Sequence, residues 1–135
     1  MVADGVLEMR LVVTAQDYDT AVAFYRDALG LRQLAAFDDG AGHVVILDAG
    51  RATLELSDVP HAEHIDGVEV GRRVAGHIRV AFQVADADGV TDRLTAAGAT
   101  LLAPPTPTPW RSRNSRLEAP GGLQLTLFEN AQAEF

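Results

Sequence analysis

Two reactive residue types are missing from this sequence. Cysteine is absent, and all 11 basic residues are arginine, so lysine is absent as well. The first absence excludes disulfides, thiol nucleophiles and cysteine-ligated metals, and the second excludes Schiff-base chemistry and a P-loop lysine. The serines, Ser57, Ser112 and Ser115, lie outside any Gly-x-Ser-x-Gly motif. Carboxylates, arginines and four histidines remain, which suit metal or general acid–base catalysis if the protein is an enzyme.

The chain also lacks a long apolar run and an excess of positive charge. Its 135 residues are typical of one domain and can bury a core without disulfides. The formal net charge of −8 disfavours nucleic acid and anionic membranes as partners, because both would be repelled. No segment approaches the run of about 18 apolar residues that a membrane-spanning helix needs. We therefore expect a cytoplasmic protein without nucleic-acid or membrane partners.

A segment near the start of the chain recurs further along it. Residues 10–19 and 79–88 align with an offset of 69 residues, and one Arg and two Asp coincide in the two copies. Each copy leads into apolar residues at helical spacing, over about 18–29 and 88–97. An aspartate near each start and a glycine after each end are typical of helix termini. The sequence therefore predicts one structural unit that occurs twice.

Each predicted helix is followed by three short strand-like runs. These runs lie at 33–37, 44–48 and 52–56, and again at 100–103, 112–118 and 123–129. Each module is therefore β-α-β-β-β, which indicates an α+β protein rather than a doubly wound parallel sheet. The modules span about 7–57 and 76–130 of a single domain. A polar join of about 58–75, which contains Pro60, connects them and is expected to be a loop.

Alternation along the strands separates an apolar face from a mixed face. The apolar positions include Leu11, Val13, Leu54, Leu56, Val80, Phe82, Leu125 and Leu127. Because successive side chains of a strand point to opposite faces, the residues between them share the other face. That face carries arginine, glutamate, glutamine, threonine and histidine. We expect the apolar face to lie under the helices and the mixed face to meet solvent or to line a polar-walled cavity.

Two motifs carry a resemblance to a known family. Residues 23–31 read Ala-Phe-Tyr-Arg-Asp-Ala-Leu-Gly-Leu, and residues 120–128 form a Pro-Gly-Gly turn that leads into the last strand. Together with the repeat, they make the chain, from about residue 7 to residue 129, resemble the vicinal oxygen chelate superfamily of glyoxalase I, bleomycin-resistance proteins and extradiol dioxygenases. The resemblance implies two β-α-β-β-β modules that curl their sheets into a cup, and a homodimer.

The resemblance also locates the metal ligands of the family's metalloenzymes. Carried over residue by residue, those positions are Arg10, Glu55, Arg79 and Thr126. Only Glu55 is a metal ligand by type, because a guanidinium stays protonated, offers no lone pair and repels a cation. We therefore predict no metal and no other cofactor. The alternative is a divalent metal held by Glu55 with His77 or His43, which falls short of the usual three protein ligands.

Two interpretations of Arg10, Glu55 and Arg79 remain open. The glutamate could sit between the two arginines in a structural salt-bridge cluster. The arginines could instead present hydrogen-bond donors to an acidic or carbonyl-rich ligand. Both roles are compatible with one cup.

Aromatic residues are candidates for the wall of the cup. The Pro-rich run 104–109 is stiff, cannot be a central strand and is expected to be a loop that delivers Trp110. The resemblance implies that Trp110 lies at the mouth of the cup, where it could stack on a planar ligand, and the alternative is a hydrophobic plug at an interface. Phe37 and Phe128 are further candidates for the wall.

Three histidines have alternative interpretations. His61 and His64 have the spacing of a chelating pair if their segment is helical, although a solvated surface or lid is the simpler interpretation. His43 begins a predicted strand and could face the cup.

The leading hypothesis is a metal-independent protein that binds a small molecule, sequestering an antibiotic or other planar natural product. The candidate ligand-binding residues are Trp110, Phe37, Phe128, Arg10, Glu55, Arg79, Gln83, Asn114, Gln124, Thr126 and His43. The alternative is a lyase, isomerase or dioxygenase in which Glu55 is the general base, with or without a divalent metal. A third possibility is an interaction module whose cup is filled by its own side chains.

Overall fold

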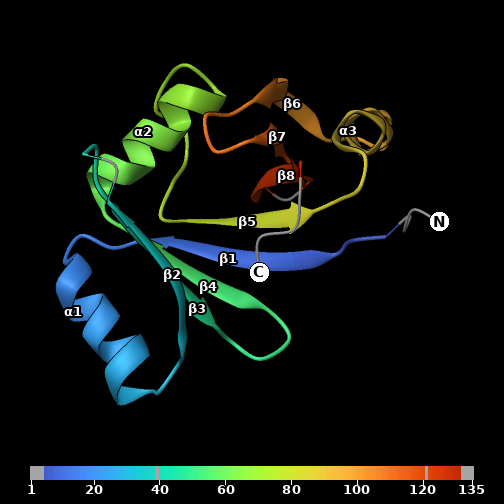
Figure 1. Ribbon diagram of the computed structural model, residues 1–135. Helices are drawn as coiled ribbons and strands as arrows, with labels where there is room; N and C mark the ends of the chain where they lie inside the picture. Colours follow the sequence, from blue (N-terminus) through green and yellow to red (C-terminus); the bar gives the residue numbers. More distant parts are fainter. Residues whose placement is uncertain (1–4, 39, 121, 132–135) are drawn as a thin grey trace.

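A computed structural model of the protein describes residues 5–38, 40–120 and 122–131, and all eight strands within these residues form one sheet (Figure 1). The elements are β1 (Glu8–Thr14), α1 (Tyr18–Val22), β2 (Gln33–Asp38), β3 (His43–Asp48), β4 (Thr53–Ser57), α2 (Val59–Glu69), β5 (Ile78–Gln83), α3 (Ala87–Ala96), β6 (Thr100–Pro107), β7 (Ser112–Glu118) and β8 (Gln124–Asn130). Helix α1 continues directly into a π-helical segment, Ala23–Ala28. None of the helices in the described ranges is both long and apolar enough to cross a membrane.

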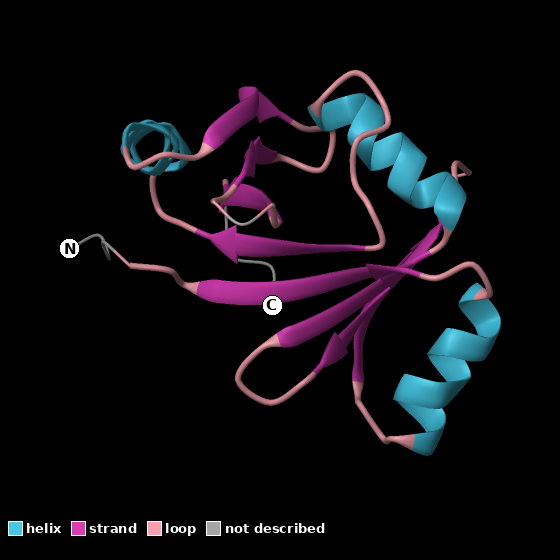
Figure 2. Ribbon diagram, turned by 180° about the vertical axis from the view of Figure 1, so that it is seen from behind, coloured by secondary structure: helices cyan, strands magenta, loops and turns pink. Residues whose placement is uncertain are grey.

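The sheet joins two similar halves edge to edge. Its strand order is β2-β3-β4-β1-β5-β8-β7-β6. The first strand of each half pairs in parallel with the last, β1 with β4 and β5 with β8, and the halves meet where β1 and β5 pair antiparallel. Figure 2 shows these two strands side by side across the middle of the molecule. The predicted α+β fold of two β-α-β-β-β modules is confirmed.

The predicted apolar face lies under the two module helices. In the first module, Leu11, Val13, Leu54 and Leu56 pack in one cluster with Val22 of α1. In the second, Phe82 and Leu127 pack with Val90 and Leu94 of α3. Each helix begins at the expected aspartate: Asp17 accepts a hydrogen bond from the Thr20 amide, and Asp86 accepts one from the Gly89 amide. The mixed face is therefore turned away from both helices.

The join between the modules is a helix and not the loop that we expected. Helix α2 covers Val59–Glu69 and contacts β3 of one module and β7 of the other. Asp58 caps its first turn by accepting a hydrogen bond from the His61 amide, and Pro60 lies in that turn, where its missing N–H costs nothing. The sequence did not reveal this helix, because its apolar and polar residues are only weakly separated onto opposite faces. Its buried side carries carboxylates, which have partners on the sheet.

The Pro-rich segment also differs from the expected loop. Strand β6 runs through Pro104, Pro105 and Pro107 and pairs antiparallel with β7. It lies at the end of the strand order, so the missing N–H groups of its prolines leave the rest of the sheet intact. The prediction that this run is not a central strand is thus confirmed, and the prediction that it is a loop is wrong.

A buried ionic network fastens α2 to the sheet. Arg116 of β7 has no exposed side-chain surface, and its Nη1 and Nη2 donate to Asp66 Oδ1 at 2.8 Å and Glu69 Oε1 at 2.7 Å. Asp66 also accepts hydrogen bonds from the amides of Val74 and Ala75. Burial acts to raise the pKa of Asp66, but these amides and the arginines outweigh it, so the pKa lies below its ordinary value. The network therefore holds both the helix and the segment that follows it.

We expect Arg116→Met to lower the free energy of unfolding by about 3–5 kcal/mol, because it leaves two carboxylates buried without their cation. Arg113→Met is a matched control on the same strand. Arg113 makes two hydrogen bonds of 2.9 Å to Asp88, but its side chain is 39% exposed, so its loss should cost less than about 1 kcal/mol. Urea unfolding of both variants measures the difference, and equal losses would contradict the assigned role of Arg116.

Candidate functional site

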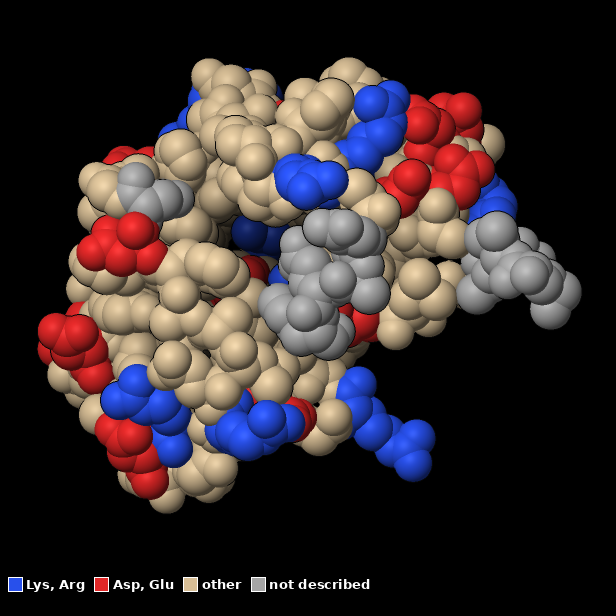
Figure 3. Space-filling model, in the orientation of Figure 1, with Lys and Arg blue, Asp and Glu red and all other residues tan. Residues whose placement is uncertain are grey.

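The mixed face of the sheet and α2 enclose a cavity of about 950 Å³, within the size range of small-molecule sites. Figure 3 shows a hollow near the middle of one face of the molecule, with basic atoms visible inside it. The cavity is lined by Arg10, Leu34, Ala35, Phe37, Val44, Ile46, Glu55, His61, His64, Ile65, Glu69, Arg79, Ala81, Pro109, Trp110, Asn114, Thr126, Phe128 and Asn130. Both modules and the join contribute to one site.

Most of the residues predicted for the site lie together on this wall. These are Arg10, Phe37, Glu55, Arg79, Trp110, Asn114, Thr126 and Phe128. The alternation that placed them on one face of the sheet is the reason why they meet. Their function as ligand contacts stays a prediction.

Three further candidates lie outside the wall. Gln124 belongs to the α2 network, since it accepts a hydrogen bond from Arg116 and donates one to the carbonyl of Val74. His43 lies 2.9 Å from Asp58, the cap of α2. The hydrogen bond to Asp58 and the charges of nearby carboxylates raise the pKa of the imidazole, although burial acts to lower it. Gln83 stands at the end of β5, opposite Phe128 of β8.

Arg79 is the central cation of the cavity. Its Nη1 donates a 2.9 Å hydrogen bond to the hydroxyl of Thr126 on the neighbouring strand β8. Burial lowers the pKa of this guanidinium, whereas the carboxylates of Glu69 and Glu55 act to raise it. Arginine nevertheless keeps its proton in proteins, so a permanent positive charge faces the cavity.

Arg10 and Glu55 do not form the predicted Arg–Glu–Arg cluster. Arg10 pairs with Glu8 at 3.1 Å, and its guanidinium carbon lies 4.6 Å from the centre of the Phe128 ring, in cation–π geometry. Among the described residues, no hydrogen bond or ion pair joins Glu55 to Arg10 or Arg79. The carboxylate of Glu55 therefore stays available to a ligand, and the first of the two interpretations is wrong.

The residues at the family's metal positions do not fit a divalent cation. Arg10, Glu55, Arg79 and Thr126 all line the cavity, but the Arg79 guanidinium occupies the space beside Thr126 and would repel a metal there. His61 and His64 lie on α2 with ring centres 6.4 Å apart, and within the described ranges no group of three or more ligating side chains is placed to hold an ion.

A chain of hydrogen bonds positions the turn that carries Trp110. The turn closes where the Arg111 amide donates to the carbonyl of Thr108 at 3.1 Å. The Thr108 hydroxyl lies 2.9 Å from that of Ser112, which donates to Asn114, and Asn114 donates to Glu69 at 2.7 Å. Trp110 is thus tied to the same network that holds α2, and its ring borders the cavity rather than packing in the core.

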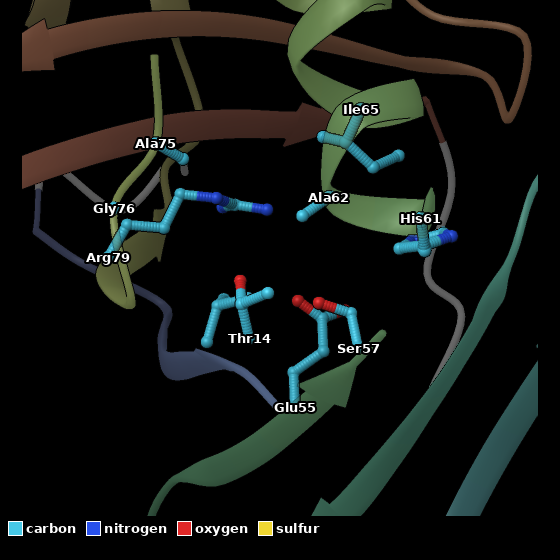
Figure 4. Close-up of a pocket in the computed structure, with 10 residues that line it drawn as sticks. Thr14, Glu55, Ser57, His61, Ala62, Ile65, Ala75, Gly76 and Arg79 are labelled. Atoms are coloured by element: carbon cyan, nitrogen blue, oxygen red, sulfur yellow. The ribbon is translucent and has the colours of Figure 1, made fainter. Parts of the chain in front are cut away.

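At the inner end of the cavity is a small recess with a volume of about 10 Å³, lined by both polar and apolar residues. Figure 4 shows Arg79 extending into it from β5 and Glu55 rising from β4 toward the same space. Thr14 and Ser57 add hydroxyl groups, and Ala62 and Ile65 of α2 close it from above. Space of this size accommodates one water-sized group between the two charges.

Sequence reasoning missed the residues that α2 and β3 contribute. Ile65 and Glu69 line the cavity because the join is helical, and the signal for that helix was present in Asp58 followed by Pro60. Val44 and Ile46 line it from β3, whose other face also packs in the core. A strand buried on both faces shows no alternation, so its cavity face could not be assigned.

Comparisons with known proteins agree with this architecture. The crystal structure of a hypothetical protein from Bacillus halodurans C-125 is 17% identical with a TM-score of 0.68, over 93% of this chain and 96% of its own. The methylmalonyl-CoA epimerase of Streptomyces coelicolor, solved with 2-nitronate-propionyl-CoA, is 20% identical with a TM-score of 0.68, over 95% of this chain and 100% of its own. The methylmalonyl-CoA epimerase of Mycobacterium tuberculosis is 21% identical with a TM-score of 0.63, over 98% and 94%. A search of curated proteins found no match.

These identities are low enough that the neighbours establish the fold alone. The family comparison reaches further, because its match extends from β1 into β8 and so covers both modules and the join. Matching over residues 9–127, the chain belongs to the Glyoxalase/Bleomycin resistance protein/Dioxygenase superfamily.

Proposed function

We propose that the protein binds a small organic molecule in the cavity between the sheet and α2. The observation that carries this proposal is the wall itself, which combines aromatic rings with a permanent cation and an accessible carboxylate. Phe37 and Trp110 offer flat apolar surface near the opening, while Glu55 and Arg79 offer polar contacts at the inner end. This division suits a ligand with a planar apolar part and a polar end.

A more specific version of this proposal is that the protein sequesters an antibiotic. Neither the family match nor the structural neighbours favour an antibiotic over another ligand, and several of the neighbours are epimerases of CoA esters. The proposal therefore concerns a small-molecule site in which an antibiotic is one candidate ligand. We also propose that the protein is a homodimer and that it is cytoplasmic, as expected from the sequence.

We expect Phe37→Ala to weaken binding of the planar dye 8-anilinonaphthalene-1-sulfonate about 2–10-fold, because a ring contact contributes about 0.5–1.5 kcal/mol. Dye fluorescence and quenching of Trp110 report the binding. Phe37 is 53% exposed and lines the cavity, so its truncation spares the core.

Phe24→Ala is the matched control for this experiment. Phe24 is 60% exposed but lies on the helix of the first module, away from the cavity wall. Its truncation should leave the dissociation constant unchanged. Equal weakening by both variants, or dye binding without a Trp110 response, would contradict the proposed site.

A second candidate function is proton transfer at a carbon atom next to a carbonyl group. It is favoured by Glu55, whose carboxylate faces the cavity without an ion pair to a described side chain. In this reaction Glu55 takes the proton, the C–H electron pair moves into the carbonyl to form an enolate, and Arg79 donates a hydrogen bond to the enolate oxygen. Delivery of a proton to the opposite face of that carbon then gives the epimer, and delivery to a different carbon gives an isomer. The structural similarity to methylmalonyl-CoA epimerases is consistent with such chemistry.

For this candidate we expect the wild-type protein to exchange the acidic C–H of methylmalonyl-CoA with deuterium from heavy water, as measured by NMR. Glu55→Gln should slow the exchange by about 100-fold or more, because the base is lost. Glu63→Gln, an exposed change on α2, should leave the rate unaltered. Exchange no faster than in buffer would reject this candidate and leave the binding function standing.

A further inference from the structure

Two of the charged side chains that face the cavity have an ion-pair partner in the protein. One carboxylate and one guanidinium have no such partner among the described residues. Arg10 has Glu8 as its ion-pair partner, and Glu69 has Arg116. Glu55 has no ion-pair or hydrogen-bond partner among the described side chains, and the side-chain hydrogen bond of Arg79 goes to the neutral hydroxyl of Thr126. The cavity therefore offers a ligand one carboxylate and one guanidinium.

These two residues are aligned in a single row across three strands. The register pairs Val12 of β1 with Glu55 of β4 on one side and with Arg79 of β5 on the other. Residues aligned in this way point to the same face, and two strand spacings place their Cα atoms about 10 Å apart. Figure 4 shows the side chains of Glu55 and Arg79 extending toward the same space, and Val12 also lines this recess.

The charges converge without touching. No nitrogen of Arg79 lies within 4.0 Å of a Glu55 carboxylate oxygen in the described structure, although each charge acts on the other through space. A ligand group placed between them contacts both. A ligand with a single charge would satisfy one of them and would displace water from the other without replacing its hydrogen bonds, which costs binding free energy.

We propose that the ligand of this site is zwitterionic, with an ammonium group toward Glu55 and a carboxylate toward Arg79, as in an α-amino acid. The inference rests on the proposed small-molecule function and specifies the ligand class for it. Both charged groups of an α-amino acid are attached to one carbon atom, so one ligand can reach both side chains from the main cavity, which Glu55 and Arg79 also line. The apolar part of the ligand then extends toward Phe37 and Trp110.

Three compounds that share one aromatic ring test this proposal on the unchanged protein: phenylalanine, 3-phenylpropanoate and 2-phenylethylamine. We expect phenylalanine to bind at least about tenfold more tightly than either singly charged compound, since each lacks one charge-assisted hydrogen bond. Isothermal titration calorimetry, or ligand-observed NMR for weak binding, measures the three dissociation constants.

Two charge-neutralising variants assign the contacts. Glu55→Gln should weaken phenylalanine and 2-phenylethylamine about tenfold and spare 3-phenylpropanoate, whereas Arg79→Gln should weaken phenylalanine and 3-phenylpropanoate and spare the amine. Glu63→Gln should change none of the constants, and thermal unfolding verifies that each variant is folded.

The proposal is overturned if phenylalanine fails to bind more tightly than each of the two singly charged compounds, or if none of the three compounds binds. Binding of the anilinonaphthalene dye with its Phe37 dependence intact would then show that the small-molecule function survives and that only the zwitterionic class is wrong. If dye binding is lost as well, both the zwitterionic ligand class and the small-molecule function are wrong.

Discussion

The buried guanidinium of Arg116 is the contact on which the cavity depends. Helix α2 shows little separation of apolar and polar residues, so apolar burial alone does not hold it on the sheet. Instead, Asp66 and Glu69 meet Arg116 inside the protein, and Asp66 also binds the amides that lead toward β5. Because buried charges are costly unless they are paired in good geometry, this arrangement specifies one position for the helix. The helix in turn forms the roof of the cavity.

The same network extends to the turn that carries Trp110, one of the residues that line the cavity. Glu69 accepts a hydrogen bond from Asn114, and Asn114 continues through Ser112 to the turn before Trp110. One ionic centre thus holds helix α2, the segment that leads to β5 and the turn that carries Trp110. The chain as a whole is acidic, but the wall of the cavity is not, because it has two arginines, Arg10 and Arg79, and two carboxylates, Glu55 and Glu69. Such a preformed, polar inner end favours a specific small ligand over a flat protein partner.

Much of this arrangement follows from the sequence, and the exceptions have physical causes. Alternation predicted which residues share the cup, because side chains on a strand must alternate and the apolar set has to lie under the helices. Helix α2 escaped prediction because its buried side carries Asp66 and Glu69, whose partner Arg116 lies far away in the chain. The Arg–Glu–Arg cluster failed for a similar reason, since Arg10 pairs with its neighbour Glu8 and stacks on Phe128. Ion pairs between residues that are far apart in the chain leave no pattern in the sequence around either residue.

The fixed guanidinium of Arg79 is the cation of the cavity, at a place where the metalloenzymes that this chain resembles hold a metal ion. Titration of the purified protein with Zn²⁺ and Ni²⁺, followed by calorimetry, tests it most directly. We expect no one-to-one site that depends on Glu55, so the heats of the wild-type protein and of Glu55→Gln should coincide. Stoichiometric metal binding that Glu55→Gln abolishes would contradict it.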